Sequence, residues 1–181
     1  QERHEIYLAR QRGDPPPWTT DPILRAYRFC NVFRELDRTT IWIRKNIREP
    51  FVDHENLWIM LAIARTVNRI ETLAGLFGSD SWPEHPRFKP KNLGWGLTMR
   101  AKLGLPVYTG AYMIRAESDA RKKWYSWTKS RYVAEIVIGR LWEQREEWNV
   151  ALKTKGLSLE EVWEWFQDPY YVGWGPFMAY E

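Results

Sequence analysis

Apolar residues recur at helical spacing along most of this chain. The clearest stripe covers residues 57–73, where apolar positions lie three or four residues apart and follow an acidic start signal at Asp53. A second stripe begins after Thr128 and covers residues 133–152, with Glu and Arg at many of the positions between. We expect the two stripes to form helices that pack in one core, with Gly156 ending the second helix.

Two further helices are predicted near the N-terminus from their start and stop signals. Asp21 followed by Pro22 is typical of a helix start, because aspartate caps the first turn and proline needs no hydrogen bond at the first helical position. This signal predicts a helix over residues 22–36. A second helix, over residues 41–47, is expected to end before Pro50, because the residue preceding a proline avoids the α region. We expect the two to form a hairpin.

The remaining segments predict short helices joined by loops. Residues 3–12 form an amphipathic N-terminal arm, and residues 78–90 have the Pro, Gly, Ser and Asp content of a surface loop. Residues 92–103 predict a modest helix, and the Ser and Glu of residues 158–161 form a capping box that opens a last helix. Residues 105–117 fit a buried strand or a short helix, and we favour the helix. No pair of strands emerges, so the predicted fold class is all-α, a helical bundle.

Length and composition fit one intracellular domain. A chain of 181 residues has room for one core, so we expect a single domain over residues 1–181. No apolar run reaches the length of a membrane span and no export signal is visible, which predicts a cytoplasmic protein with no membrane partner, in the host cell if the source is viral. Cys30 is the single cysteine, and His4, His54 and His85 lack metal-ligand spacing. We therefore expect no metal and no cofactor.

Charge and aromatic content permit a polyanionic partner. The net charge is +4 with a pI of about 9.2, and Lys and Arg gather in residues 44–48, 87–102 and 121–131. In the second and third clusters, cations that include Lys122 and Lys123 alternate with tryptophan. A protein that binds single strands or flipped bases needs cations for the phosphates and aromatic rings for the bases. Such runs are more often solvated surface, and most of the twelve Trp are expected to fill the core.

A polar block within residues 28–40 is the first candidate site. Its candidate catalytic residues are Arg28, Asn31, Arg34, Asp37 and Arg38. On the predicted helix most of them share one face, where two arginine forks beside an amide and a carboxylate suit a phosphate or a polarised base edge. The alternative is a solvated face of paired Arg and Glu side chains, and the spacing alone favours this alternative.

The last eleven residues, 171–181, form the second candidate site. A Gly-x-Gly turn between helices lets the backbone turn tightly and exposes amides to a DNA phosphate, which is the physics of a helix-hairpin-helix contact. An ordinary glycine-rich connection fits the segment equally well. The candidate DNA-binding residues are Gly173, Trp174, Gly175, Phe177, Lys122 and Lys123. No Walker-type loop and no Ser/His/Asp or Cys/His arrangement is found, so the chain by itself is not a P-loop kinase.

Several blocks, in order along nearly the whole chain, resemble one family. The blocks are residues 3–7, 17–19, 21–24, 27–40, 108–112 and 175–181, and the Asn-x-x-Arg-Glu-x-Asp-Arg stretch is the most specific. They resemble the helical domain of the 5-hydroxymethyluracil DNA kinases of phage base hypermodification. That family includes the α-glutamyl/putrescinyl-thymine pyrophosphorylases (amino acid:DNA transferases) and is distantly similar to helix-hairpin-helix DNA glycosylases. The resemblance implies a glycosylase-like helical bundle.

The resemblance also implies a reaction on modified thymine in double-stranded DNA. An amine or amino-acid co-substrate displaces pyrophosphate from activated 5-hydroxymethyluracil, and the three arginines of the polar block hold the leaving group while Asp37 deprotonates the amine or orients an arginine. The alternative is a non-catalytic DNA-binding module that accompanies a P-loop kinase partner domain. A base-excising glycosylase is disfavoured, because the aspartate that follows the hairpin in glycosylases is missing. For the same reason we expect the chain to be truncated after Glu181.

Overall fold

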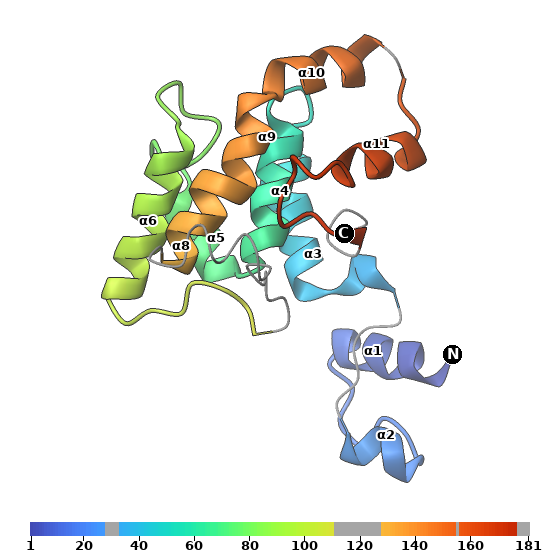
Figure 1. The fold of residues 1–181 in the computed structure, drawn as a ribbon. Coiled ribbons are helices and arrows are strands. Elements are labelled where there is room, and N and C mark those ends of the chain that lie inside the picture. Colours follow the sequence, from blue (N-terminus) through green and yellow to red (C-terminus); the bar gives the residue numbers. More distant parts are fainter. Residues whose placement is uncertain (28–32, 111–127, 155, 177–181) are drawn as a thin grey trace.

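Helices are the only regular secondary structure in residues 1–27, 33–110, 128–154 and 156–176, which are the residues that the computed structural model describes (Figure 1). The all-α prediction is confirmed. In chain order the elements are α1 (Glu2–Arg12), α2 (Pro22–Ala26), η1 (Arg34–Leu36), α3 (Arg38–Ile43), η2 (Arg44–Arg48), α4 (Leu57–Val67), α5 (Ile70–Leu76), α6 (Pro90–Lys102), α8 (Lys129–Tyr132), η3 (Val133–Ile138), α9 (Gly139–Glu143), α10 (Arg145–Thr154) and α11 (Leu159–Phe166).

The core forms around α4, which packs against η2, η3 and α5. The α4 side chains Ile59, Met60 and Ile63 are completely buried. α8, η3 and α9 run on from one another as a single helical rod in which η3 is a π-helical segment, and Val137 and Leu141 of this rod join the same core. The first stripe and the second stripe as far as Leu141 therefore pack in one core, as the sequence predicts, whereas Leu152 at the end of the second stripe is exposed.

α6 packs closely against α8 and η3. A Cβ atom at Gly94 would lie 3.3 Å from the Ala134 Cβ, so glycine allows the two helices to approach here. Leu93 and Leu97 of α6 are completely buried and belong to the core. The predicted helix over residues 92–103 is confirmed, with Pro90 at its first position.

Residues 57–73 do not form the single helix that the sequence predicts, because they are divided between α4 and α5. Asn68 has a φ of 46°, a left-handed conformation that asparagine tolerates better than most residues, and it ends α4. After an extended residue the chain starts α5, which turns Leu73 into the core. The residue at the N-terminal cap is Asn56, and not the predicted Asp53.

Beyond the rod, α10 and α11 extend the bundle. Gln144 interrupts the second apolar stripe between α9 and α10, so that Trp148 remains buried whereas Leu152 is partly exposed. The predicted capping box is confirmed, because Ser158 accepts from the Glu161 backbone N–H while the Glu161 side chain accepts from that of Ser158.

The segment over residues 78–90 is a loop, as predicted, but it is not confined to the surface. It consists of successive turns, and both Trp82 and Phe88 are buried in the core. Trp82 contacts Phe77 with ring centroids 4.8 Å apart, and Phe88 contacts Trp142 at 4.7 Å. Aromatic anchors therefore fix this loop, although its turn residues indicated only surface.

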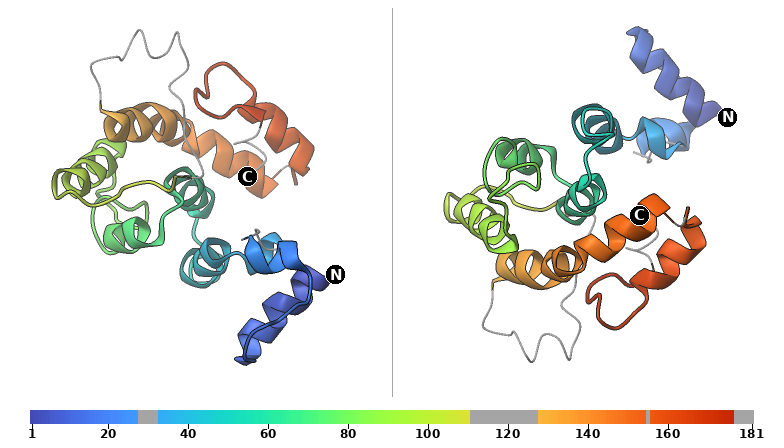
Figure 2. Two further views of the ribbon diagram at one scale, coloured as in Figure 1. Left: turned by 90° about the horizontal axis from the view of Figure 1, so that it is seen from below. Right: turned by 90° about the horizontal axis from the view of Figure 1, so that it is seen from above.

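The N-terminal region departs most from the sequence prediction. Figures 1 and 2 show α1 and α2 outside the bundle, and neither helix buries a residue. The predicted helix over residues 22–36 is wrong, because Tyr27 is extended after the short α2, and Phe33 is extended before the 3₁₀ turn η1. Residues 28–32 between them lie outside the described ranges. The predicted helix over 41–47 is confirmed and starts earlier, at Arg38, continuing through the π-helical η2.

Residues 105–110 contain no helix, which contradicts the favoured interpretation of that stretch, and residues 111–117 lie outside the described ranges. Val107 is buried, and the Thr109 backbone N–H donates to the Val67 carbonyl at 3.3 Å. No helix in the described ranges is long and apolar enough to cross a membrane. Among those same residues, no three His, Cys, Asp or Glu side chains gather as a metal site.

Candidate functional site

A cavity of about 530 Å³ opens between α3, η2, α4, α10 and α11. Its lining combines two kinds of side chain. The polar part consists of Glu35, Thr40, Arg44, Arg48 and Arg65. The apolar part includes Trp58, Leu61, Trp148, Phe166 and Trp174. A volume of this size lies in the range of about 300–1,000 Å³ that is common for small-ligand sites.

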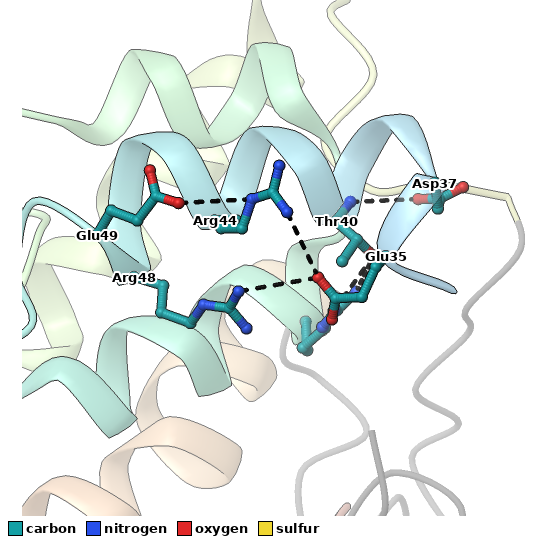
Figure 3. Close-up of polar contacts among 7 residues, drawn as sticks. Glu35, Asp37, Thr40, Arg44, Arg48 and Glu49 are labelled. Atoms are coloured by element: carbon teal, nitrogen blue, oxygen red, sulfur yellow. Dashed lines mark hydrogen bonds and ion pairs between the residues drawn. The ribbon is translucent and has the colours of Figure 1, made fainter. Parts of the chain in front are cut away.

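Asp37 fixes the helix that carries the polar part. Its backbone is extended, and its Oδ2 atom accepts a hydrogen bond from the backbone N–H of Thr39 at 3.0 Å. The same atom accepts from the backbone N–H of Thr40 at 3.3 Å (Figure 3). The helix that starts here places Thr40, Arg44 and Arg48 on one face, because they lie four residues apart. Asp37 therefore positions the cavity edge through the backbone.

We expect Asp37→Ala to lower the free energy of unfolding by about 0.5–2 kcal/mol, because two backbone N–H groups lose their acceptor. Asp37→Asn keeps a capping acceptor and is expected to be close to neutral. Urea denaturation measures both changes. The matched control is Asp53→Ala, which removes an exposed carboxylate that caps no helix in the structure. Equal losses for Asp37→Ala and Asp53→Ala would contradict the capping role.

The guanidinium groups of Arg44 and Arg48 converge on one carboxylate. Glu35 Oε2 lies 4.0 Å from Arg44 Nη1 and 3.8 Å from Arg48 Nη2 (Figure 3). Arg44 Nε also lies 3.5 Å from Glu49 Oε1. These ion pairs are longer than a charge-assisted hydrogen bond of about 2.7–2.9 Å, so the arginines retain the capacity to bind another anion.

Arg65 of α4 adds a third cation at the same edge. Its two terminal nitrogens donate to Thr40 Oγ1 at 3.3 and 3.4 Å. Three guanidinium groups thus face two carboxylates, and the edge carries a net positive charge. Arginine suits this position, because its planar fork binds phosphate or carboxylate oxygens in pairs.

The aromatic lining is a packed cluster centred on Trp148. The Trp148 ring stacks on Trp58 with centroids 5.1 Å apart and an interplanar angle of 23°, and it lies 5.0 Å from Phe166. Phe166 in turn lies 5.1 Å from Trp174. Offset and tilted pairs of this kind stabilise an apolar cluster beyond the area they bury.

The indole N–H groups of the three tryptophans that line the cavity, Trp58, Trp148 and Trp174, are bonded within the protein. Trp58 donates to Asn149 Oδ1 at 2.7 Å, and Trp148 donates to the Tyr171 hydroxyl at 2.8 Å. Burial raises the pKa of Tyr171, so its hydroxyl stays neutral. The cavity therefore has no indole donor to offer a ligand, and Trp58 is the lining tryptophan whose ring is partly exposed.

The structure separates the predicted catalytic residues. Arg34 begins η1 and Arg38 begins α3, and the extended Asp37 separates these two helices. The prediction that these residues share one face of a single helix is therefore wrong. None of these three residues lines the cavity. Arg28 and Asn31 lie outside the described residues. The assignment of catalytic roles to the five stays a prediction.

Arg38 acts on α5. The pKa of Glu71 lies below its usual range because the carboxylate accepts a hydrogen bond from its own backbone N–H, and because Arg69 and Arg38 are positively charged nearby. Glu71 is at the surface, where water screens such interactions. Arg38 thus contributes to the charge of the α5 surface.

The predicted DNA-binding turn is packed against the core at its first glycine. Gly173 has a φ of 91°, and a Cβ atom there would lie 2.9 Å from Val137 Cγ2. Trp174 is 4% exposed, and its Nε1–H donates to the Val137 carbonyl, so its ring packs in the core, and its predicted DNA contact stays a prediction. Gly175 faces open space. Phe177, Lys122 and Lys123 lie outside the described residues, and the helix-hairpin-helix element stays a prediction.

Sequence reasoning missed Arg44, Arg48 and Arg65 as site residues. The basic run over residues 44–48 was visible as charge, but the four-residue spacing from Thr40 has meaning only once the helix start at Asp37 is known. Arg65 interrupts an apolar stripe, and no local pattern pairs it with Thr40, which lies 25 residues earlier.

These features define an all-helical protein with an arginine-edged aromatic cavity. The chain belongs to the family described as "5-hmdU DNA kinase, helical domain", whose family model matches residues 1–181. The protein named "5-hmdU DNA kinase" of Bacillus phage SP10 is 30% identical over 189 residues, which cover 99% of this chain and 28% of that relative. No solved structure matches. The resemblance predicted from the sequence is confirmed, and the chain spans little more than a quarter of its relative.

Proposed function

We propose that this chain is a DNA-binding helical domain of phage thymine hypermodification, which presents 5-hydroxymethyluracil in DNA to a kinase activity in the host cytoplasm. Its family and the name of its phage relative support the substrate. The single observation that carries the binding role is the edge of Arg44, Arg48 and Arg65 beside an aromatic-lined cavity.

The arrangement suits a nucleotide turned out of the helix stack. Cations at the cavity edge neutralise backbone phosphates and release counterions. An extruded base needs an enclosed pocket with flat apolar surfaces, because it loses its stacking partners in the duplex. The half-buried side chains Trp58, Leu61 and Phe166 supply such surfaces in the same cavity as Arg48.

A second candidate is transfer of an amine or amino acid onto pyrophosphorylated 5-hydroxymethyluracil, with loss of pyrophosphate. The loose approach of Arg44 and Arg48 to a single carboxylate favours it, because the same two forks suit a departing pyrophosphate. Asp37→Asn tests the predicted role of Asp37 as the base, because the variant keeps the helix cap. Loss of amine incorporation in a folded Asp37→Asn protein supports transfer, and unchanged incorporation contradicts the catalytic role of Asp37.

We expect Arg48→Gln to weaken binding to duplex DNA that contains 5-hydroxymethyluracil and to reduce the salt dependence of binding. Each phosphate contact contributes a slope of about −0.9 in log affinity against log salt, so losing one contact removes roughly one unit of slope. Fluorescence anisotropy between about 50 and 200 mM salt measures both effects.

The control is Arg145→Gln, which removes the same charge from α10 at a residue that pairs with Glu146 and does not line the cavity. Equal weakening by Arg48→Gln and Arg145→Gln would show that only total charge matters. Equal affinity of the wild-type chain for thymine and for 5-hydroxymethyluracil duplexes would remove the proposed substrate preference.

A further inference from the structure

The outer face of α6 carries a tryptophan between two lysines. Lys91, Trp95 and Lys102 are exposed and are spaced close to whole helical turns, so they form one stripe. The buried residues Leu93 and Leu97 lie on another face of the helix, against α8 and η3. Trp95 is 65% exposed, in contrast to the completely buried Trp82 and Trp148.

Trp95 shares a hollow in the surface with other exposed apolar side chains. It borders a hollow of about 290 Å³ together with Leu103 and Leu105, which are also exposed. Single exposed apolar residues are ordinary, but three large ones that line the same hollow suit an interaction surface. Figures 1 and 2 show α6 at the edge of the bundle opposite α11, so this surface is separate from the arginine-edged cavity.

The charges at this surface decide which partner it suits. Lys91 and Lys102 flank the tryptophan, and Arg100 lines the hollow, where its Nε–H donates to the Pro106 carbonyl at 2.9 Å. Asp80 is the carboxylate among the lining residues in the described part of the chain. Cations on both sides of a flat apolar ring match a polyanion that has flat apolar faces, which is a nucleic acid with unpaired bases.

We propose that the α6 surface, formed by Lys91, Trp95, Lys102, Leu103 and Leu105, binds single-stranded or locally unpaired DNA, with a base stacked on the Trp95 indole. The inference rests on the proposed function, in which DNA is the ligand. It adds a second contact, on the far side of the bundle from α11, that holds a strand whose bases are unpaired. The duplex with an extruded base would be held at the cavity, and the unpaired strand at α6.

The test measures binding of the 181-residue chain to a single-stranded oligodeoxythymidine and to a duplex of equal length at low salt. We expect Trp95→Ala to weaken single-strand binding roughly 5- to 100-fold and duplex binding much less, because stacking on an aromatic ring is lost. Trp95→Phe should restore most of the affinity. Lys91→Ala should lower the salt slope by about one unit, whereas Lys153→Ala, an exposed lysine on α10, should weaken binding less.

The outcomes separate this inference from the proposed function. If Trp95→Ala leaves single-strand affinity unchanged while Arg48→Gln weakens duplex binding, the α6 surface binds something else, such as a protein, and only the inference fails. If the wild-type chain binds neither oligonucleotide at low salt, both the inference and the proposed function fail. Because Trp95 is exposed, the thermal unfolding of Trp95→Ala should match that of wild type, which checks that the variant is folded.

Discussion

Replacing Trp148 with alanine is expected to destabilise the protein by about 3–5 kcal/mol, which is the cost of removing a large aromatic side chain from a packed core. Trp148 is 1% exposed and contacts Trp58, Trp165, Phe166 and Tyr171 through its ring. The substitution leaves a cavity and also removes the donor that bonds the Tyr171 hydroxyl. Thermal and urea unfolding measure the loss.

The matched control for Trp148→Ala lies on the same helix. Val150 is 60% exposed, so Val150→Ala should change the free energy of unfolding by less than about 0.5 kcal/mol. Both α10 variants remove apolar atoms, and they differ in burial. A mild effect of Trp148→Ala would mean that α10 and α11 do not form the aromatic wall of the cavity.

The second large effect is expected at Gly173. An alanine there must adopt a φ of 91°, and its Cβ would lie 2.9 Å from Val137 Cγ2. Backbone strain of this kind costs about 1–3 kcal/mol, and overpacking against a core side chain costs about 1–3 kcal/mol more. We expect Gly173→Ala to lower the melting temperature strongly and to displace Trp174 from the core.

Gly175→Ala is the comparison for Gly173→Ala. Gly175 has no neighbouring atoms within 4 Å of an added Cβ and no positive φ, so the variant should unfold like the wild type. The Gly-x-Gly pattern alone does not distinguish the two glycines, whereas the structure places only Gly173 against Val137. Similar melting temperatures for the two variants would show that the turn does not pack on Val137.

The sequence predicted correctly those helix ends that are fixed by residues within the same turn. The capping box at Ser158 and the proline at the start of α6 are contacts within a single turn, so the sequence contains all of the information. The break at Asn68 was missed because asparagine inside an apolar stripe costs a helix little by propensity. Its left-handed conformation becomes favourable when α5 packs on the core.

The site could not be read from local patterns, because it is assembled from distant segments. Arg65 and Thr40 are 25 residues apart, and Trp58 bonds Asn149, which lies 91 residues further along the chain. Asp37 was predicted to deprotonate the amine or to orient an arginine, and in the structure its carboxylate caps a helix. A short polar side chain before a helix serves both purposes equally well in sequence, and only the backbone geometry distinguishes them.

The π-helical segment η3 has a consequence for how relatives of this protein vary in length. A π turn contains one residue more than the α turn that it replaces, so it behaves as a single-residue insertion that leaves the helix faces on either side in register. A relative lacking one residue within 133–138 would keep the faces of α8 and α9 aligned. It would lose the local widening beside Ala134, where α6 approaches the rod, and the Val137 carbonyl that holds Trp174 would be displaced. Gaps of one residue in this segment should therefore accompany changes at the positions of Gly94 and Trp174.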